Sequence, residues 1–119
     1  MKRTLDILTA LANKTRLLAF LILLEGDFCV CELEQMLDVE QSCLSHQLRI
    51  LRHLGLVDTK QKGRWTVYSV LPEIKKDDVI RAIQKNVKLY TLEKMKISEV
   101  KNDQYKSCQE YPRKKREEE

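Results

Sequence analysis

The chain has 119 residues, 43% of them hydrophobic, and its 22 basic and 18 acidic side chains leave a formal net charge of +4. This length suits one domain with a modest core, which we expect to be supported by oligomerisation rather than by disulfides. The longest apolar run, LLAFLILL, is too short for a membrane-spanning helix of about 20 residues, and we see no signal-peptide pattern in the sequence. These features predict a cytoplasmic protein that does not cross a membrane.

The first third of the chain predicts three helices. Apolar residues at helical spacing predict a first helix over residues 5–12 and a second one that Asn13 caps and that contains the apolar run. We expect Gly26 to end the second helix, and Asp27 offers an N-cap for a third, short helix that runs through Leu37.

Residues 41–54 predict a fourth helix with two contrasting sides. At 100° per residue its leucines gather on one side, with Cys43 at the flank as a half-buried, small apolar side chain. The opposite side is polar and basic, and it carries Ser42, Ser45, His46, Arg49, Arg52 and His53. This side suits contact with a polyanion, and a solvated charged surface is the alternative interpretation.

The sequence period changes after Gly55, which suits the left-handed turn that ends the fourth helix. Residues 56–59 and 65–70 are rich in β-branched and aromatic side chains and flank the sequence KQKGR, which predicts a β-hairpin with a basic tip. Apolar spacing between residues 77 and 95 then predicts one long amphipathic helix. We expect the highly charged residues 98–119 to form a disordered tail.

Two helices joined by a tight turn and followed by a basic hairpin have the order of a winged helix-turn-helix. An α-helix fits the DNA major groove, where Arg and His donate to base edges, while a basic hairpin adds salt-sensitive contacts to the phosphates. We therefore predict a mainly α-helical winged helix-turn-helix domain over residues 1–97, with double-stranded DNA as its partner. No catalytic triad, phosphate loop or carboxylate pair is visible, so we do not expect an enzyme.

Two stretches of the sequence resemble one known family. SCLSHQLRILRHLGLVDTKQKGRWTVYSV closely resembles the recognition helix and wing of ArsR/SmtB metalloregulatory repressors, and LANKTRLLAFLILLEGDFCVCELEQML resembles the helices that precede them. The resemblance covers roughly residues 4–74 and implies a homodimeric transcriptional repressor, paired through its first and last helices, on a palindromic operator. Carried over by position, the DNA contacts fall on Ser42, Ser45, His46, Arg49, Lys62 and Arg64. We expect the neighbouring Gln47 and Trp65 to pack against the protein itself.

Cys29 and Cys31, the cysteine pair, stand two residues apart on what the pattern predicts to be a solvent-facing first turn of the third helix. On a regular helix their side chains point about 200° apart, so one small ion reaches both sulfurs only if the turn unwinds. Because this helix precedes the predicted DNA-reading helix, unwinding would link ion binding to DNA release.

Coordination chemistry indicates the kind of ion. Soft thiolates select soft ions, and three-coordinate As(III) or Sb(III) accepts two protein sulfurs plus a small thiol or hydroxide more readily than Cd(II) accepts half of a site. The resemblance agrees, because CVC at this place is the inducer box of arsenite sensors and of cadmium/lead sensors. Arsenite sensors of the commonest type have a further cysteine where Glu34 stands here. Cys108 in the tail and Cys43 are candidate third sulfurs, and Glu32 is either an oxygen ligand or an acid that stabilises the start of the helix.

Three other functions stay open at this point. A repressor that responds to Cd(II) or Pb(II) would use the same cysteine pair. A redox-responsive repressor would join Cys29 or Cys31 to Cys108 or to the partner chain on oxidation, and would ignore metalloids. A thiol-based metal carrier or enzyme would bind metal but show no salt-dependent affinity for DNA.

Overall fold

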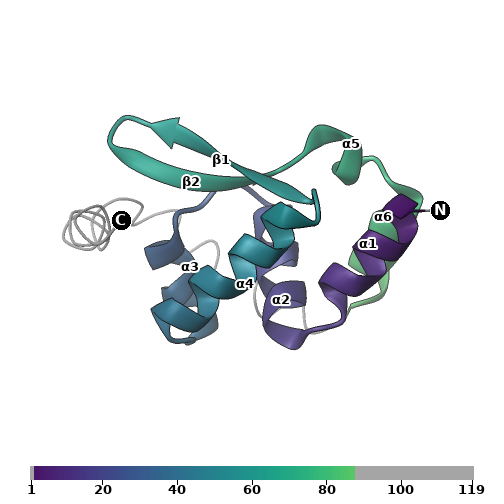
Figure 1. Cartoon of the computed structure of the whole chain (residues 1–119), viewed down its shortest axis with the longest axis horizontal. Coiled ribbons are helices and arrows are strands. Elements are labelled where there is room, and N and C mark those ends of the chain that lie inside the picture. The colour runs from purple at the N-terminus through teal and green to yellow at the C-terminus, as the bar shows by residue number, and fades with distance from the viewer. Residues whose placement is uncertain (1, 88–119) are drawn as a thin grey trace.

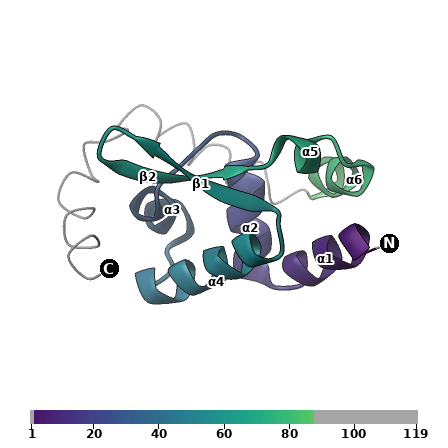
Figure 2. The ribbon, with the colours of Figure 1, turned by 45° about the horizontal axis from the view of Figure 1, so that its top comes forward.

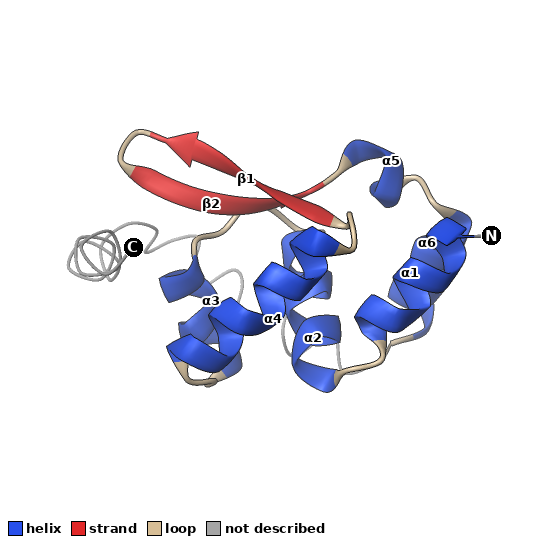
Figure 3. Cartoon of the chain, viewed as in Figure 1, coloured by secondary structure: helices blue, strands red, loops and turns tan. Residues whose placement is uncertain are grey.

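The computed structural model describes residues 2–87, which form six helices and, along one side of them, a two-stranded hairpin (Figures 1 and 3). The elements are α1 (Lys2–Leu11), α2 (Lys14–Leu23), α3 (Val30–Leu37), α4 (Gln41–His53), β1 (Val57–Lys62), β2 (Trp65–Val70), α5 (Pro72–Lys75) and α6 (Asp78–Asn86). This is the predicted architecture of a winged helix-turn-helix, with α3 and α4 as its helix pair and the antiparallel β1–β2 hairpin as its wing. The predicted charged tail and Cys108 lie outside the described residues.

The core lies between α2, α3 and α4, and the apolar pattern predicted it correctly. Leu44, Leu48 and Leu51 of α4 are fully buried, and they pack in one cluster with Phe20 of α2 and Leu33 of α3. Burying such a side chain contributes about 1.5–3 kcal/mol to stability. The buried leucine stripe therefore fixes which side of α4 faces away from the protein.

Local signals set most of the element ends. Asn13 caps α2 as predicted, because its Oδ1 atom accepts a hydrogen bond from the Arg16 backbone N–H at 3.1 Å. Gly55, with a φ of 84°, follows α4 in the left-handed conformation that the sequence predicted. Gly63, with a φ of 63°, allows a tight turn, since Lys62 already pairs with Trp65 across the hairpin. The tip of the wing is therefore only Gly63 and Arg64.

The start of α3 differs from the prediction. Asp27 is not its N-cap; that position is Cys29, whose backbone is extended with φ −84° and ψ 168°. The side chain of Glu32 accepts a hydrogen bond from the Cys29 backbone N–H at 2.9 Å. An acid three residues after the N-cap can accept a hydrogen bond from this otherwise unpaired backbone N–H. Cys29 has an acid at that spacing and Asp27 does not. The helix therefore begins two residues later than an Asp27 cap would allow.

The last described part of the chain also differs from the prediction. A short helix, α5, begins at Pro72, whose ring suits the first position of a helix. α6 begins after Asp77, which caps it through the Val79 N–H at 2.9 Å, but it ends at Asn86 with Val87 extended. One continuous helix from residue 77 to residue 95 is therefore wrong at residue 87, and residues 88–95 lie outside the described part.

The elements define two ends of the molecule. α3 lies beneath the hairpin, while α1, α5 and α6 lie together beyond the other end of the hairpin (Figures 1 and 2). The cysteine pair belongs to the first end, because it begins α3. Any effect of the pair on the rest of the protein therefore starts at the wing and α3.

Candidate nucleic-acid interface and cysteine pair

The outer side of α4 carries the residues predicted to read DNA. Ser42, His46 and Arg49 are exposed and Ser45 is half-buried, all on the side opposite the buried leucines. The hydroxyl of Ser42 donates to a carboxylate oxygen of Glu40 at 3.0 Å. One solvent-facing side of α4 thus offers hydroxyl, imidazole and guanidinium groups. These groups can donate hydrogen bonds to base edges in the major groove and to phosphates.

The wing presents further basic residues. Lys62, at the end of β1, and Arg64, in the turn, are both exposed, as is Lys60. The amide of Gln61 donates to the Thr66 hydroxyl at 2.9 Å and ties the two strands together near the tip. The wing can therefore hold positive charge in a defined place, as contacts to a DNA backbone require.

One arginine that the sequence did not single out fixes α4 against its neighbours. The Arg16 guanidinium donates to Gln47 Oε1 at 2.7 Å, and to the carbonyl oxygens of Ala10 at 2.6 Å and Thr9 at 3.2 Å. It therefore ties the end of α1 to the middle of α4, and the prediction that Gln47 packs against the protein is confirmed. The sequence signal for this role of Arg16 is its position just after the end of a helix. A basic side chain there can reach the last carbonyl oxygens of that helix.

The cysteine pair is buried, so the predicted solvent-facing position is wrong. Only 4% of Cys29 and 2% of Cys31 is exposed. Their Sγ atoms are 2.8 Å apart. The predicted 200° separation does not apply, because Cys29 precedes the helix instead of belonging to its first turn. The two sulfurs meet while α3 stays intact, and the requirement that α3 unwinds is therefore wrong.

The surroundings of the cysteine pair come from the wing. Val67 of β2 is fully buried against the two cysteines, and the half-buried Trp65 packs on the same cluster. This confirms that Trp65 packs against the protein itself. Cys31 is also disulfide-bonded in this structure, so a metal ion could use its sulfur only after reduction.

No complete metal site is present among residues 2–87, where no group of three or more His, Cys, Asp or Glu side chains could hold an ion. Glu32 is fully buried, but one of its oxygens serves the Cys29 N–H. It thus acts as the acid at the helix start, while its other carboxylate oxygen is buried without a hydrogen-bond partner. Cys43 is exposed on α4, not half-buried as predicted. The described residues therefore offer two sulfurs and leave the third ligand to another group.

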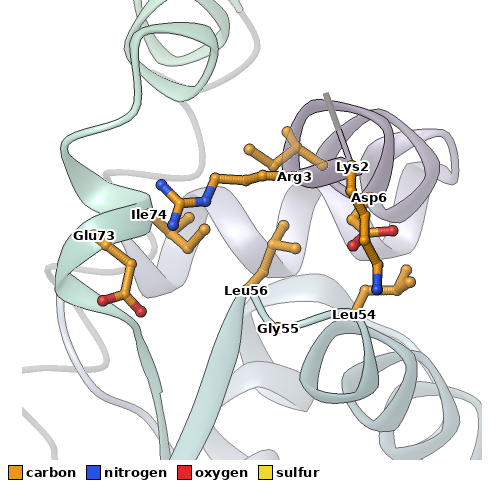
Figure 4. Close-up of a pocket in the computed structure, with 9 residues that line it drawn as sticks. Lys2, Arg3, Asp6, Leu54, Gly55, Leu56, Glu73 and Ile74 are labelled. Atoms are coloured by element: carbon orange, nitrogen blue, oxygen red, sulfur yellow. The ribbon is translucent and has the colours of Figure 1, made fainter.

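A pocket of about 220 Å³ lies elsewhere, between α1, the end of α4 and α5 (Figure 4). Arg3 of α1 extends toward Ile74 of α5, and Asp6, Leu54 and Glu73 are among the other lining residues. None of the residues predicted to bind DNA or metal lines this pocket. The candidate site therefore consists of the outer surface of α4 and the wing, together with the buried sulfur pair.

No helix within residues 2–87 has the length and apolarity needed to cross a membrane.

Comparison with known proteins places these features in one family. The family described as "Bacterial regulatory protein, arsR family" matches residues 13–59, which contain α2, α3, α4 and the start of the wing. The arsenic resistance transcriptional regulator ArsR1 of Pseudomonas putida is 40% identical over 65 residues, which are 54% of this chain and 51% of that protein. A homolog of the cadmium resistance transcriptional regulatory protein CadC from Staphylococcus aureus is 34% identical over 74 residues, 61% of each protein.

The fold agrees with the sequence matches. The crystal structure of the transcriptional repressor BigR from Xylella fastidiosa is similar, with a TM-score of 0.60 and 30% identity over 69% of this chain and 84% of that one. The chain spans about half the length of curated relatives such as ArsR1. It has the winged helix-turn-helix, the polar outer side of α4 and the matching residues 13–59, and it is therefore a member of the arsR family of bacterial transcriptional regulators.

Proposed function

We propose that this protein is a homodimeric, DNA-binding transcriptional repressor that leaves its operator when As(III) or Sb(III) binds the reduced cysteine pair. The observation that carries the proposal is the buried 2.8 Å approach of the Cys29 and Cys31 sulfurs beside the wing. A ligand that binds both sulfurs acts next to an element that we assign to DNA binding, which is the linkage that a ligand-controlled repressor needs.

The proposed DNA contacts are those of the sequence analysis. Ser42, Ser45, His46 and Arg49 would enter the major groove from α4, while Lys62 and Arg64 would contact the phosphate backbone or the minor groove from the wing. Their exposure supports the assignment, since all but the half-buried Ser45 are exposed. The bound polymer would be double-stranded DNA with two half-sites.

The proposed homodimer pairs through its first and last helices. On α1, Leu5 is 55% exposed and Leu8 is 51% exposed, and their spacing puts them on one side of the helix. A second copy would cover these large apolar side chains and double the number of DNA contacts. A two-fold dimer would also explain why such a small module suffices for a specific operator.

The preference for As(III) or Sb(III) follows from the number of sulfurs. Two cysteine sulfurs fit a three-coordinate metalloid that takes its third ligand from a small thiol or hydroxide, or from Cys108 outside the described residues. Cd(II) and Pb(II) are the alternative inducers. ArsR1 and the CadC homolog, both similar to this chain, are named for arsenic and for cadmium resistance.

Cysteine variants test this function directly. Cys29→Ser and Cys31→Ser should each bind operator DNA like the reduced wild type but fail to leave it when arsenite is added, because one sulfur remains. Cys43→Ser is the matched control, since it removes an exposed cysteine of α4 and should leave induction unchanged. Fluorescence anisotropy of a labelled operator measures all three. Release of DNA by either pair variant at the wild-type arsenite concentration would refute the assignment of the inducer site.

A second candidate, a thiol redox switch, is favoured by the disulfide at Cys31. Such a repressor would lose DNA on oxidation, and the reduced form would ignore arsenite. The same anisotropy assay, run with an oxidant in place of arsenite, distinguishes the two functions.

A further inference from the structure

The segment that leads into the cysteine pair is attached to the wing at three successive residues. Asp27 forms ion pairs from its Oδ2 atom to Lys60 Nζ at 3.8 Å and to Lys62 Nζ at 3.6 Å. Phe28 exchanges backbone hydrogen bonds with Tyr68 of β2, at 2.8 and 3.3 Å. Cys29 comes next and packs against β2 through its side chain. Residues 27–29 therefore act as an extra, short edge of the wing.

A ligand on the reduced cysteine pair would act directly on this attachment, because Cys29 is its last residue. The sulfurs are 2.8 Å apart, and a three-coordinate metalloid bonded to both of them adds an atom and a third ligand at this place. The two cysteines are nearly fully buried beneath Val67 and Trp65, so room for the ligand must come from a shift of residues 27–29 or of β2.

Asp27 is placed to convert this movement into a change in DNA affinity. Its carboxylate faces Lys60 and Lys62, two of the basic groups that the wing offers to DNA phosphates. Only 18% of the Asp27 side chain is exposed, while the two lysine side chains are 60% and 50% exposed and can turn outward. The carboxylate is thus the fixed partner, and phosphate must compete with it.

We propose that Asp27 competes with DNA phosphate for Lys60 and Lys62, and that ligand binding at the cysteine pair lowers DNA affinity by shifting this competition in favour of Asp27. The inference rests on the proposed function for the identity of the ligand and adds the route of the signal. In this route α3 stays helical, and residues 27–29 and β2 carry the movement.

The test compares Asp27→Asn with Asp58→Asn in the reduced full-length protein. Both substitutions remove one negative charge next to basic groups, but Asp58 pairs with Arg52 of α4 at 3.1 Å and belongs to β1 rather than to the segment before the cysteines. Operator Kd is measured at several salt concentrations, with and without arsenite. The emission of Trp65, the single tryptophan of the chain, reports arsenite binding independently of DNA.

Asp27→Asn should tighten arsenite-free operator binding by about two- to fivefold, the range expected for releasing exposed ion pairs. It should also lower the ratio of Kd with arsenite to Kd without it by about threefold or more, while Trp65 still reports arsenite binding. Asp58→Asn should keep the wild-type ratio. An Asp27→Asn ratio equal to that of the wild type would overturn the proposed route. If arsenite changes neither Trp65 emission nor wild-type Kd, the proposed function fails, and the arsenite-free Kd of Asp27→Asn still decides whether Asp27 competes with DNA.

Discussion

At the scale of single residues, the side of α4 on which a residue lies decides its role. Leu48 is fully buried in the core, whereas its neighbour Arg49 is exposed on the opposite side. A change at Leu48 therefore affects folding, while a change at Arg49 affects what α4 can touch. This separation makes DNA contacts testable without loss of the fold.

Arg49→Ala should weaken specific operator binding by about 1–3 kcal/mol, because a base-edge or phosphate contact from the middle of α4 is lost. Its thermal unfolding midpoint should stay close to that of the wild type, since no core contact changes. Arg81→Ala, which removes an exposed arginine from α6, is the matched control and should keep wild-type operator affinity. Anisotropy and a thermal melt measure both properties. If Arg49→Ala bound the operator as tightly as the Arg81→Ala control, α4 would not be the helix that contacts the bases.

At the scale of elements, the two-residue turn of the wing depends on Gly63. Its φ of 63° lies in the left-handed region, and an added Cβ would meet no atom within 4 Å. A substitution there is therefore costly because of the backbone conformation alone, without any steric clash. A substitution at Gly63 therefore measures the cost of the backbone conformation by itself.

Gly63→Ala should lower the free energy of unfolding by about 1–2 kcal/mol, the usual cost of a left-handed L-residue. Gly63→Asn should cost about as much, because Arg64 does not share the positive φ and the turn is therefore of type II′, whose first position takes glycine. Chemical denaturation followed by circular dichroism measures the difference. If Gly63→Ala were as stable as the wild type, the positive φ would not explain the role of Gly63.

The sequence predicted the elements better than their junctions. The period of the leucines predicted α4 and its buried side, and Asn13 and Gly55 marked helix ends correctly, because each signal is local. The cysteine pair was misplaced because two N-caps competed. Asp27 is the better capping residue type, but Glu32 favours a cap at Cys29, and the wing lysines provide another partner for Asp27. That partner is distant in sequence, so no local pattern could indicate it.

At the scale of the whole molecule, the proposed repressor works as two copies of the chain. In the proposed dimer the wing and α4 of one chain would reach one half-site, and the exposed Leu5 and Leu8 of α1 would supply an apolar surface for pairing. DNA affinity should therefore depend on association. A ligand that changes the wing in each copy would then act on both half-sites at once.

The double variant Leu5→Glu with Leu8→Glu should be monomeric, because two carboxylates would be buried against the partner. Each copy should still fold, since both side chains are about half exposed in the single chain. Analytical ultracentrifugation gives the mass, circular dichroism gives the helix content, and anisotropy should show a loss of operator affinity of at least about tenfold. A dimer of unchanged affinity would contradict pairing through α1.

The central claim is that a soft ligand at the cysteine pair releases DNA, and one titration tests it most directly. An operator fragment, selected by the protein from random DNA, is bound by the reduced protein and titrated with As(III), Sb(III), Cd(II) and Pb(II), and then with an oxidant. The account predicts release by As(III) and Sb(III) at lower concentrations than by Cd(II) or Pb(II), with no release from Cys29→Ser. If the reduced protein kept its DNA with every ion and lost it only on oxidation, the claim would be contradicted.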